Sequence, residues 1–149
     1  MSVIDLVRSK VQRILTDKFG SVRLDRDDDF LLNFGKTRCF VSVEEGIGDV
    51  ETVVRIDALI LRSVKLNSKL YEWVAVEGQD YRIGSCFIWK DEDGKTGSLL
   101  FGYGLAADDL DESELILGIG CVGVTADNLA SELQPRFGGE TFFEDDEND

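Results

Sequence analysis

The chain contains no histidine in 149 residues, and it has only one proline and one methionine. The absence of histidine removes the Ser–His and Cys–His pairs of nucleophilic enzymes, the commonest general base and the commonest zinc ligand. Catalysis by carboxylates stays open, with Glu44, Glu45 and Asp57 as candidates. No nucleophile, base and orienting group can be assembled around them, so we predict a protein that is not an enzyme.

Cysteine is scarce too, and its spacing excludes the usual redox and metal motifs. Cys39, Cys86 and Cys121 are odd in number and widely separated, and no pair has C-x-x-C spacing. This pattern is typical of reduced thiols that pack as small apolar side chains in a reducing compartment. One of the three could still be a reactive thiol.

Long apolar runs are missing as well. No stretch of 18 apolar residues exists, and the start MSVIDLVRSK lacks the layout of a signal peptide. We therefore expect no membrane span and a cytoplasmic location.

Acidic residues are abundant: 30 acids against 16 bases give a net charge of −14. Six of the acids lie in the last ten residues, ETFFEDDEND, which contain no base, so −8 remains for the rest. Such a protein repels nucleic acid and anionic membranes and suits a basic protein partner. We expect no nucleic-acid partner.

The length suits one domain with a proper core. We place that domain at residues 1–138 and a tail of disordered composition at 139–149. Phe142 and Phe143 interrupt the acidic run of the tail. These two aromatic residues predict a docking motif or a self-capping segment. The alternative is a tail that is disordered throughout.

Hydrophobic periodicity predicts the elements. Residues 3–19 have helical spacing after the cap residue Ser2, and residues 30–45 form a hairpin around Gly35-Lys36. A strand follows at 52–61, then a short helix after Asn67, a second hairpin around Asp91–Gly94 and a long helix. The order α-β-β-β-α-β-β-α predicts an α+β fold, an antiparallel sheet with helices packed on it.

The stretch GIGCVG at 118–123 spells G-x-G-x-x-G, the fingerprint of a dinucleotide-binding turn. Only 26 residues follow Gly123, so no βαβ unit fits there. A helical stripe instead runs through the glycines, from Leu115 to Leu133. Leu117, Cys121 and Val124 occupy the opposite face, so the first half of this helix should be buried on two sides, by the sheet and by another helix, a partner chain or a client.

Asp25, Asp27 and Asp29 resemble the first ligands of an EF-hand loop. The glycine and the acid that this loop requires further on are replaced by Phe30 and Lys36. We therefore expect a solvated turn, and neither a metal nor a cofactor.

Some longer stretches resemble a known family. LNSKLYEWVAVEGQDYRIGSCFIWKDEDGKTGSLLFGYGL resembles the middle of actinobacterial YbjN-type proteins, and VTADNLASELQPRFGG resembles their closing helix. The element order, size and acidity look like the CesT-like type III secretion chaperone fold. The resemblance spans about residues 3–138 and is most specific over 66–138.

The resemblance implies a non-catalytic, chaperone-like module that binds a protein or peptide client and forms a homodimer through its second helix. Trp73 and Val76, which lie off the core stripe of that helix, would then form the dimer interface, or be partly buried under a loop. Apolar strand residues are the candidates for client binding, although some of them must be core: Phe40, Leu59, Phe87, Trp89, Phe101 and Tyr103. The alternative is an acidic regulatory protein whose tail binds a basic partner electrostatically.

Overall fold

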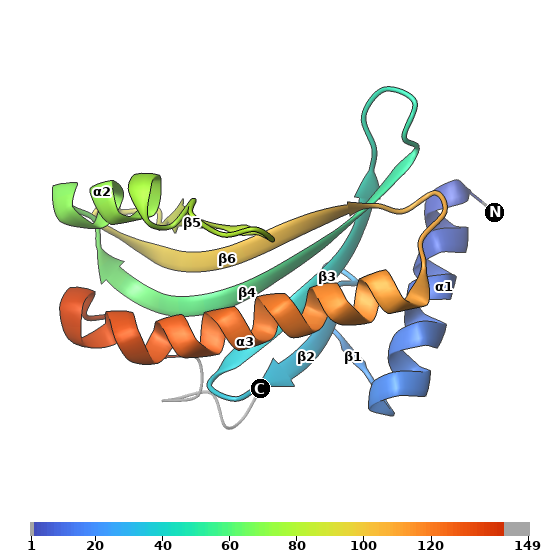
Figure 1. Ribbon diagram of the computed structural model, residues 1–149, viewed down its shortest axis with the longest axis horizontal. Coiled ribbons are helices and arrows are strands. Elements are labelled where there is room, and N and C mark those ends of the chain that lie inside the picture. Colours follow the sequence, from blue (N-terminus) through green and yellow to red (C-terminus); the bar gives the residue numbers. More distant parts are fainter. Residues whose placement is uncertain (1, 142–149) are drawn as a thin grey trace.

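The computed structural model describes residues 2–141 (Figure 1). Three helices and six strands follow one another over these residues. In order they are α1 (Val3–Phe19), β1 (Arg23–Leu24), β2 (Phe30–Phe34), β3 (Thr37–Glu45), β4 (Thr52–Lys65), α2 (Ser68–Val76), β5 (Ser85–Lys90), β6 (Thr96–Ala106) and α3 (Glu112–Phe137).

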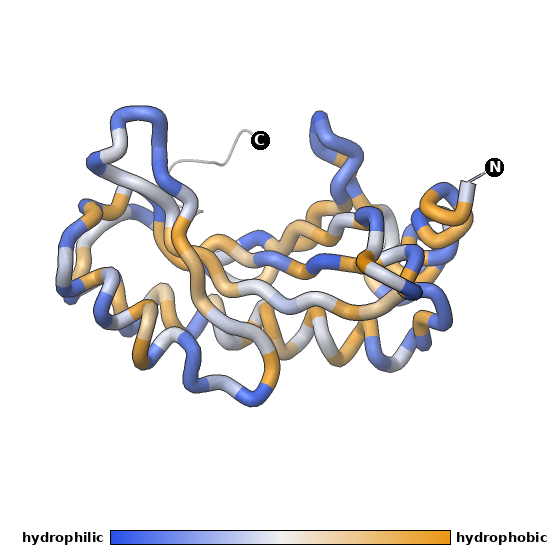
Figure 2. The backbone as a smooth tube through the Cα atoms, turned by 90° about the horizontal axis from the view of Figure 1, so that it is seen from above, coloured by the Kyte–Doolittle hydropathy of each residue, from blue (hydrophilic) through white to orange (hydrophobic). Residues whose placement is uncertain are grey.

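The strands form one antiparallel sheet in the order β1-β2-β3-β4-β6-β5. The α+β class and the predicted element order are confirmed, and the two-residue strand β1 is the one addition. Seen from above, α3 runs along the length of the sheet (Figure 2). One large core joins the buried side chains of all three helices to one face of the sheet.

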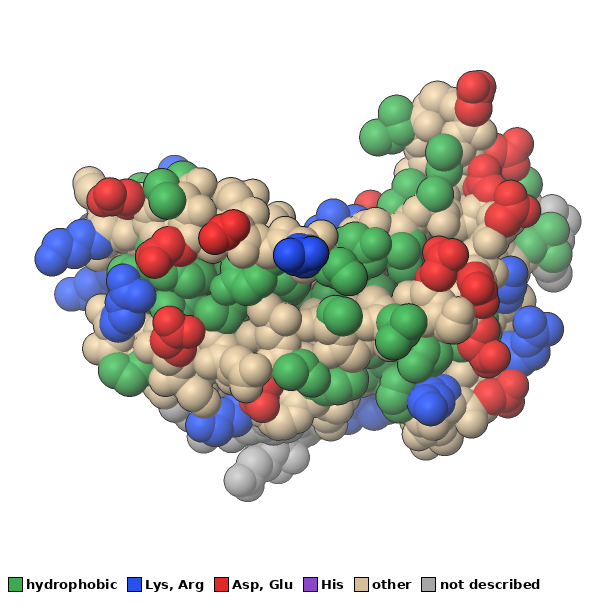
Figure 3. Space-filling view, in the orientation of Figure 1, with side chains coloured by type: hydrophobic (Ala, Val, Ile, Leu, Met, Phe, Trp, Pro, Cys, Tyr) green, Lys and Arg blue, Asp and Glu red, His purple; other side chains and the backbone are tan. Residues whose placement is uncertain are grey.

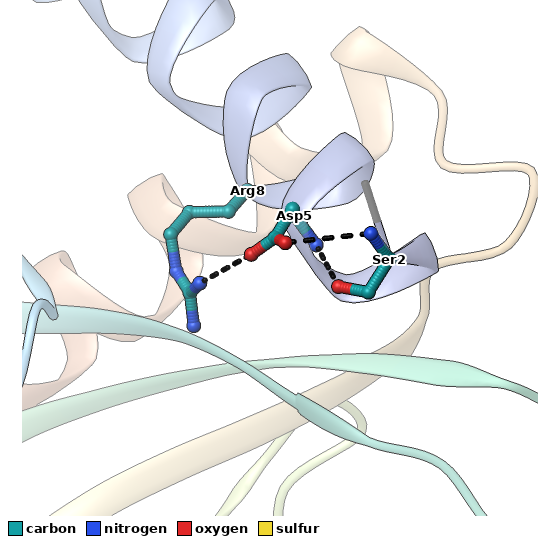
Figure 4. Close-up of polar contacts among 3 residues, drawn as sticks. All are labelled: Ser2, Asp5 and Arg8. Carbon is teal, nitrogen blue, oxygen red and sulfur yellow. Dashed lines mark hydrogen bonds and ion pairs between the residues drawn. The ribbon is translucent and has the colours of Figure 1, made fainter.

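Helix α1 begins where the sequence predicted. The Ser2 hydroxyl accepts a hydrogen bond from the Asp5 backbone N–H at 3.1 Å, and the Asp5 carboxylate accepts one from the Ser2 N–H (Figure 4). This reciprocal pair is a capping box, which satisfies two N–H groups that the first turn would leave unpaired. The buried face of the helix follows the predicted spacing: Val7, Val11, Ile14 and Leu15.

The glycines of GIGCVG lie inside α3, as predicted. A Cβ added at Gly118 would lie 3.0 Å from Ile56 Cδ1, and one at Gly123 would lie 2.5 Å from the ring of Phe34. Both glycines therefore let the helix approach the sheet more closely than alanine would allow. A Cβ at Gly120 would meet nothing within 4 Å.

By length and composition α3 could cross a membrane, which the sequence reading did not anticipate. One such helix is weak evidence, because a long core helix passes the same test. Here the helix buries nine residues, from Leu115 to Leu133, and contacts four strands. It is not a clear membrane span.

The chain after α3 returns to the sheet. Arg62 and Glu140 exchange two backbone hydrogen bonds, of 2.9 and 2.8 Å, and Gln134 donates to the Gly139 carbonyl at 3.2 Å. Thr141 is buried. Residues 139–141 thus lie against β4.

Candidate functional site

The two faces of the sheet differ in what covers them. Residues directly opposite one another on antiparallel strands share a face, and successive residues alternate. The row Val41, Ile56 and Tyr103 points toward the helices, whereas the adjacent row Phe40, Asp57 and Gly102 points the other way. We call this second side the open face.

Aromatic and aliphatic side chains gather on the open face. Leu59 and Leu100 are opposite each other on β4 and β6, and are 8% and 2% exposed. Phe40 and Phe87 pack against them as partly buried rings, and the cluster they form contains no helix residue. Trp89 lies beside Phe87, with ring centroids 6.0 Å apart, and is 60% exposed. We call Phe40, Leu59, Phe87, Trp89 and Leu100 the open-face cluster.

Four of the six predicted client-binding residues therefore come together: Phe40, Leu59, Phe87 and Trp89. The other two, Phe101 and Tyr103, lie on the opposite, helix-covered face of the sheet. Phe101 is 0% exposed and packs edge-on against Tyr81 in the helix-side core, because it alternates with Leu100 along β6. Tyr103 lies two residues after Phe101 on β6, so its side chain points to the same face of the sheet. It lines a groove there with Leu105 and Leu117.

A partly buried polar pair adjoins the cluster. Arg55 donates to the Asp57 carboxylate at 2.7 Å, and its guanidinium lies 5.9 Å from the centre of the Phe87 ring. Burial raises the pKa of Asp57, and the hydrogen bond and charge of Arg55 oppose that rise. Gly102 opposes Asp57 and leaves the space that these side chains occupy. The open face thus offers an apolar surface with one fixed polar group.

The edge beside the cluster is formed by β5. The outward N–H of Cys86 donates to the Gly78 carbonyl, and Gln79 donates to the Cys86 carbonyl. Ile88 and Lys90 lie two and four residues after Cys86 on the same strand. Their backbone N–H and C=O groups therefore point to the same outer edge of the sheet. An extended peptide could add there as a strand, with alternate side chains reaching Phe87 and Trp89.

The two residues predicted to form a dimer interface differ in exposure. Trp73 is 5% exposed and packs edge-to-face on Phe137 of α3, with ring centroids 6.3 Å apart. Trp73 packs in the core, because the end of α3 covers that side of α2. Its place in a dimer interface stays a prediction. Val76 is 65% exposed and stays available. Phe142 and Phe143 lie outside the described residues.

The acidic loop before β2 is a turn. The Asp25 carboxylate accepts hydrogen bonds from the N–H groups of Asp27 and Asp29 at 2.8 and 3.0 Å. Burial, together with the charges of Asp25 and Asp27, raises the pKa of Asp29 to about 6. Over residues 2–141 no cluster of three metal-ligating side chains is present.

The sequence reading missed Leu100, Arg55 and Gly102. Leu100 lies between two other apolar residues, Leu99 and Phe101, so the sequence does not show which face it occupies. Its pairing with Leu59 places it on the open face. The Arg55 and Asp57 pair did have a signal, because residues two apart on a strand point to the same side.

Two solved structures share this fold. E. coli YbjN has 12% identity and a TM-score of 0.64, over 86% of this chain and 91% of that one. The Yersinia pestis type III secretion chaperone SycH, solved in complex with a fragment of YscM2, has 13% identity and a TM-score of 0.52, over 83% and 98%. At these identities the likeness shows the fold alone.

No curated protein sequence matches this chain. Residues 5–145 match the family described as T3SS (YopN, CesT) and YbjN peptide-binding chaperone 1. Because this match spans nearly the whole chain, the protein belongs to that family of peptide-binding chaperones.

Proposed function

We propose that this protein is a non-catalytic, cytoplasmic chaperone that holds an extended client segment on the open face of its sheet. The open-face cluster carries the proposal, because it is an apolar cluster that contains no helix residue over residues 2–141. Trp89, 60% exposed beside Phe87, is the anchor we expect to contribute most, since aromatic side chains dominate such contacts.

The preferred client is a peptide in β conformation with apolar residues at alternate positions. Its backbone would pair with the outer edge of β5 at Ile88 and Lys90, and its alternate side chains would lie on Phe87 and Trp89. The Arg55 and Asp57 pair would select a client with a polar residue at the matching position. SycH, which has a similar fold, was solved in complex with a fragment of YscM2. This complex supports a protein or peptide as the client.

We also propose that the chaperone acts as a homodimer and binds neither nucleic acid nor membrane. Its net charge of −14 disfavours both of these anionic partners.

The experiment is a titration of fluorescently labelled peptides with alternating apolar residues, followed by anisotropy. Trp89→Ala should weaken binding about tenfold or more, the loss expected for an aromatic anchor. Val76→Ala, which removes an exposed apolar side chain from α2, is the matched control and should bind as the wild type does. Equal affinities of wild type and Trp89→Ala would refute the proposed site.

Salt separates this function from electrostatic binding by the acidic tail. Apolar capture should persist at high salt, where exposed charges are screened. Binding that is lost in salt, and lost when residues 142–149 are removed, would favour the regulatory alternative.

A further inference from the structure

Residues 139–141 lie beside β4 at a place where the sheet has no further room for them. Arg62 and Glu140 exchange two backbone hydrogen bonds there, as an antiparallel pair. A continuation of this pairing would run back along β4 toward Leu59. That edge of β4 is already taken by β3, since the Thr37 hydroxyl donates to the Leu59 carbonyl. The sheet therefore offers no strand position beyond Thr141.

The helix-covered side is closed at the same place. Lys36, in the turn before β3, donates its backbone N–H to the Asp127 carboxylate at 2.6 Å and its Nζ to the Ser131 hydroxyl at 3.1 Å. Both partners belong to α3. In the described part of the chain, the side of the sheet that remains accessible next to Thr141 is thus the open face.

Glu140 already points to that side. Leu61 opposes Leu99 and both belong to the helix-side core, so the next residue, Arg62, points to the open face. Glu140 is paired with Arg62, and its Oε2 lies 3.5 Å from Arg62 Nε. The last acid of the described chain is therefore held by an arginine of the open face.

Two further arginines lie on the open face, on β3 and β1. Arg38 is two residues before Phe40, and Arg23 shares a row with Leu31 and Phe40. Arg38 is 7% exposed, and its Nε donates to the Asn33 side chain at 3.1 Å. Both arginines line one groove of about 350 Å³ beside β2. This groove places positive charge next to the open-face cluster.

Residues 142–149, FFEDDEND, match this surface in composition and in length. Two aromatic residues come first, and five acids without a base follow. Eight extended residues span about 26 Å, whereas three strand spacings of about 4.8 Å separate β4 from β1. The aromatic pair is thus within reach of Phe40 and Leu59, and the acids are within reach of Arg38 and Arg23.

The opposite end of the molecule suits an acidic segment poorly. Residues 44–51 and 108–114 contain four and five acids, and neither segment has a base. In Figure 3 acidic side chains gather at the end of the molecule where Figure 1 shows the β3–β4 loop and the start of α3. Repulsion between like charges disfavours the acidic tail there.

We propose that residues 142–149 form an intramolecular strap on the open face. The two phenylalanines pack on Phe40 and Leu59, and the acids that follow pair with Arg38 and Arg23. The inference rests on the proposed function, because the strap covers part of the surface that we assign to the client. A client must then displace the strap, so the tail is an internal competitor that lowers the apparent affinity for clients.

Amide chemical shifts test the strap without a client. Spectra of the wild type and of the double variant Phe142→Ser/Phe143→Ser should differ at Arg38, Phe40 and Leu59, because loss of the strap changes their surroundings. Differences confined to residues 138–149 would overturn the proposal. Differences that disappear on dilution would overturn it too, since they would assign the tail to a second copy.

Peptide titration tests the competition. A strap that is closed about 70–90% of the time raises the apparent Kd about 3–10-fold, so Phe142→Ser/Phe143→Ser should bind a peptide with alternating apolar residues that much more tightly. Arg23→Gln should act in the same direction, and raised salt should remove its effect. Arg13→Gln, which changes an exposed arginine of α1, is the matched control and should bind as the wild type does. Unchanged or weaker binding by the double variant would overturn the strap as a competitor.

The two measurements separate the strap from the proposed function. If the amide shifts differ as expected but neither chain binds peptide, the client-binding proposal is lost and the contact of the tail with the open face is kept. If both chains bind peptide equally and their amide shifts agree on the open face, the strap is lost and the proposed function is kept.

Discussion

The Arg55 guanidinium donates to the Asp57 carboxylate at 2.7 Å, and both side chains lie over Gly102 of the neighbouring strand. The pair is partly shielded from water, with side chains 35% and 16% exposed. Arg55 also approaches the Phe87 ring. The absence of a side chain at Gly102 therefore shapes both the polar pair and the edge of the open-face cluster.

Replacing Gly102 should disturb this arrangement. An added Cβ would lie 2.6 Å from Arg55 Nη2 and 2.7 Å from Phe87 Cε1, so those side chains must move. We expect Gly102→Ala to lower the free energy of unfolding by about 1–3 kcal/mol and to weaken peptide binding. Gly104→Ala is the matched control, since its Cβ would have no neighbour closer than 3.6 Å. Denaturant unfolding of the two variants checks the prediction, and equal stabilities would contradict it.

Asp29 should make stability depend on pH. Burial and the nearby carboxylates raise its pKa from 3.8 to about 6, so between these values the native protein keeps a proton that the unfolded chain has released. The contribution of Asp29 to stability therefore declines as pH rises from about 4 to about 6, and stays unfavourable above that. Asp29→Asn should gain about 1 kcal/mol at pH 7.5, allowing for solvent screening, and nothing at pH 3.5.

Thermal unfolding across this pH range provides the measurement, with the exposed Asp17→Asn as control. A gain for Asp29→Asn that is the same at both pH values would contradict the assignment.

The three thiols should differ in reactivity. Burial raises the pKa of Cys39 and Cys86 to about 12, so neither forms the reactive thiolate near neutral pH. Cys121 is exposed on α3. Titration with a chromogenic disulfide reagent should label one thiol per native chain at low protein concentration, and three in denaturant. Two fast-reacting thiols in the native protein would show that the core is looser than described.

The glycines of α3 should respond oppositely to alanine. Gly123→Ala should lower the free energy of unfolding, since its Cβ would collide with the Phe34 ring. Gly120→Ala should raise the stability of the monomer by up to about 1 kcal/mol, the difference in helix propensity. Unfolding followed at protein concentrations below dimer formation compares the two, and a destabilised Gly120→Ala monomer would refute the open position of Gly120.

Local patterns were enough to predict the elements. The caps at Ser2 and Asn67 and the glycine that ends α3 are short-range features, so their position follows from neighbouring residues. The rejection of a dinucleotide-binding turn was also a local argument, based on the period of the apolar residues on both sides of the glycines.

Pairing between distant strands could not be predicted in the same way. Phe101 and Leu100 are adjacent apolar residues, and only the register with β4 decides which of them faces the helices. The burial of Trp73 by α3 was not predicted for a related reason: Phe137, which covers it, is 64 residues further along the chain. Such contacts depend on how the elements pack, which alternation within one segment does not reveal.

Tryptophan emission during peptide titration tests the central claim most directly. Trp73 is 5% exposed and Trp89 is 60% exposed, so a client on the open face should change the surroundings of Trp89 alone. We expect the emission to shift to shorter wavelength as a peptide with alternating apolar residues binds, and Trp89→Phe to abolish the shift while binding persists. Peptide binding that leaves the wild-type emission unchanged, or a shift that remains in Trp89→Phe, would contradict client capture on the open face.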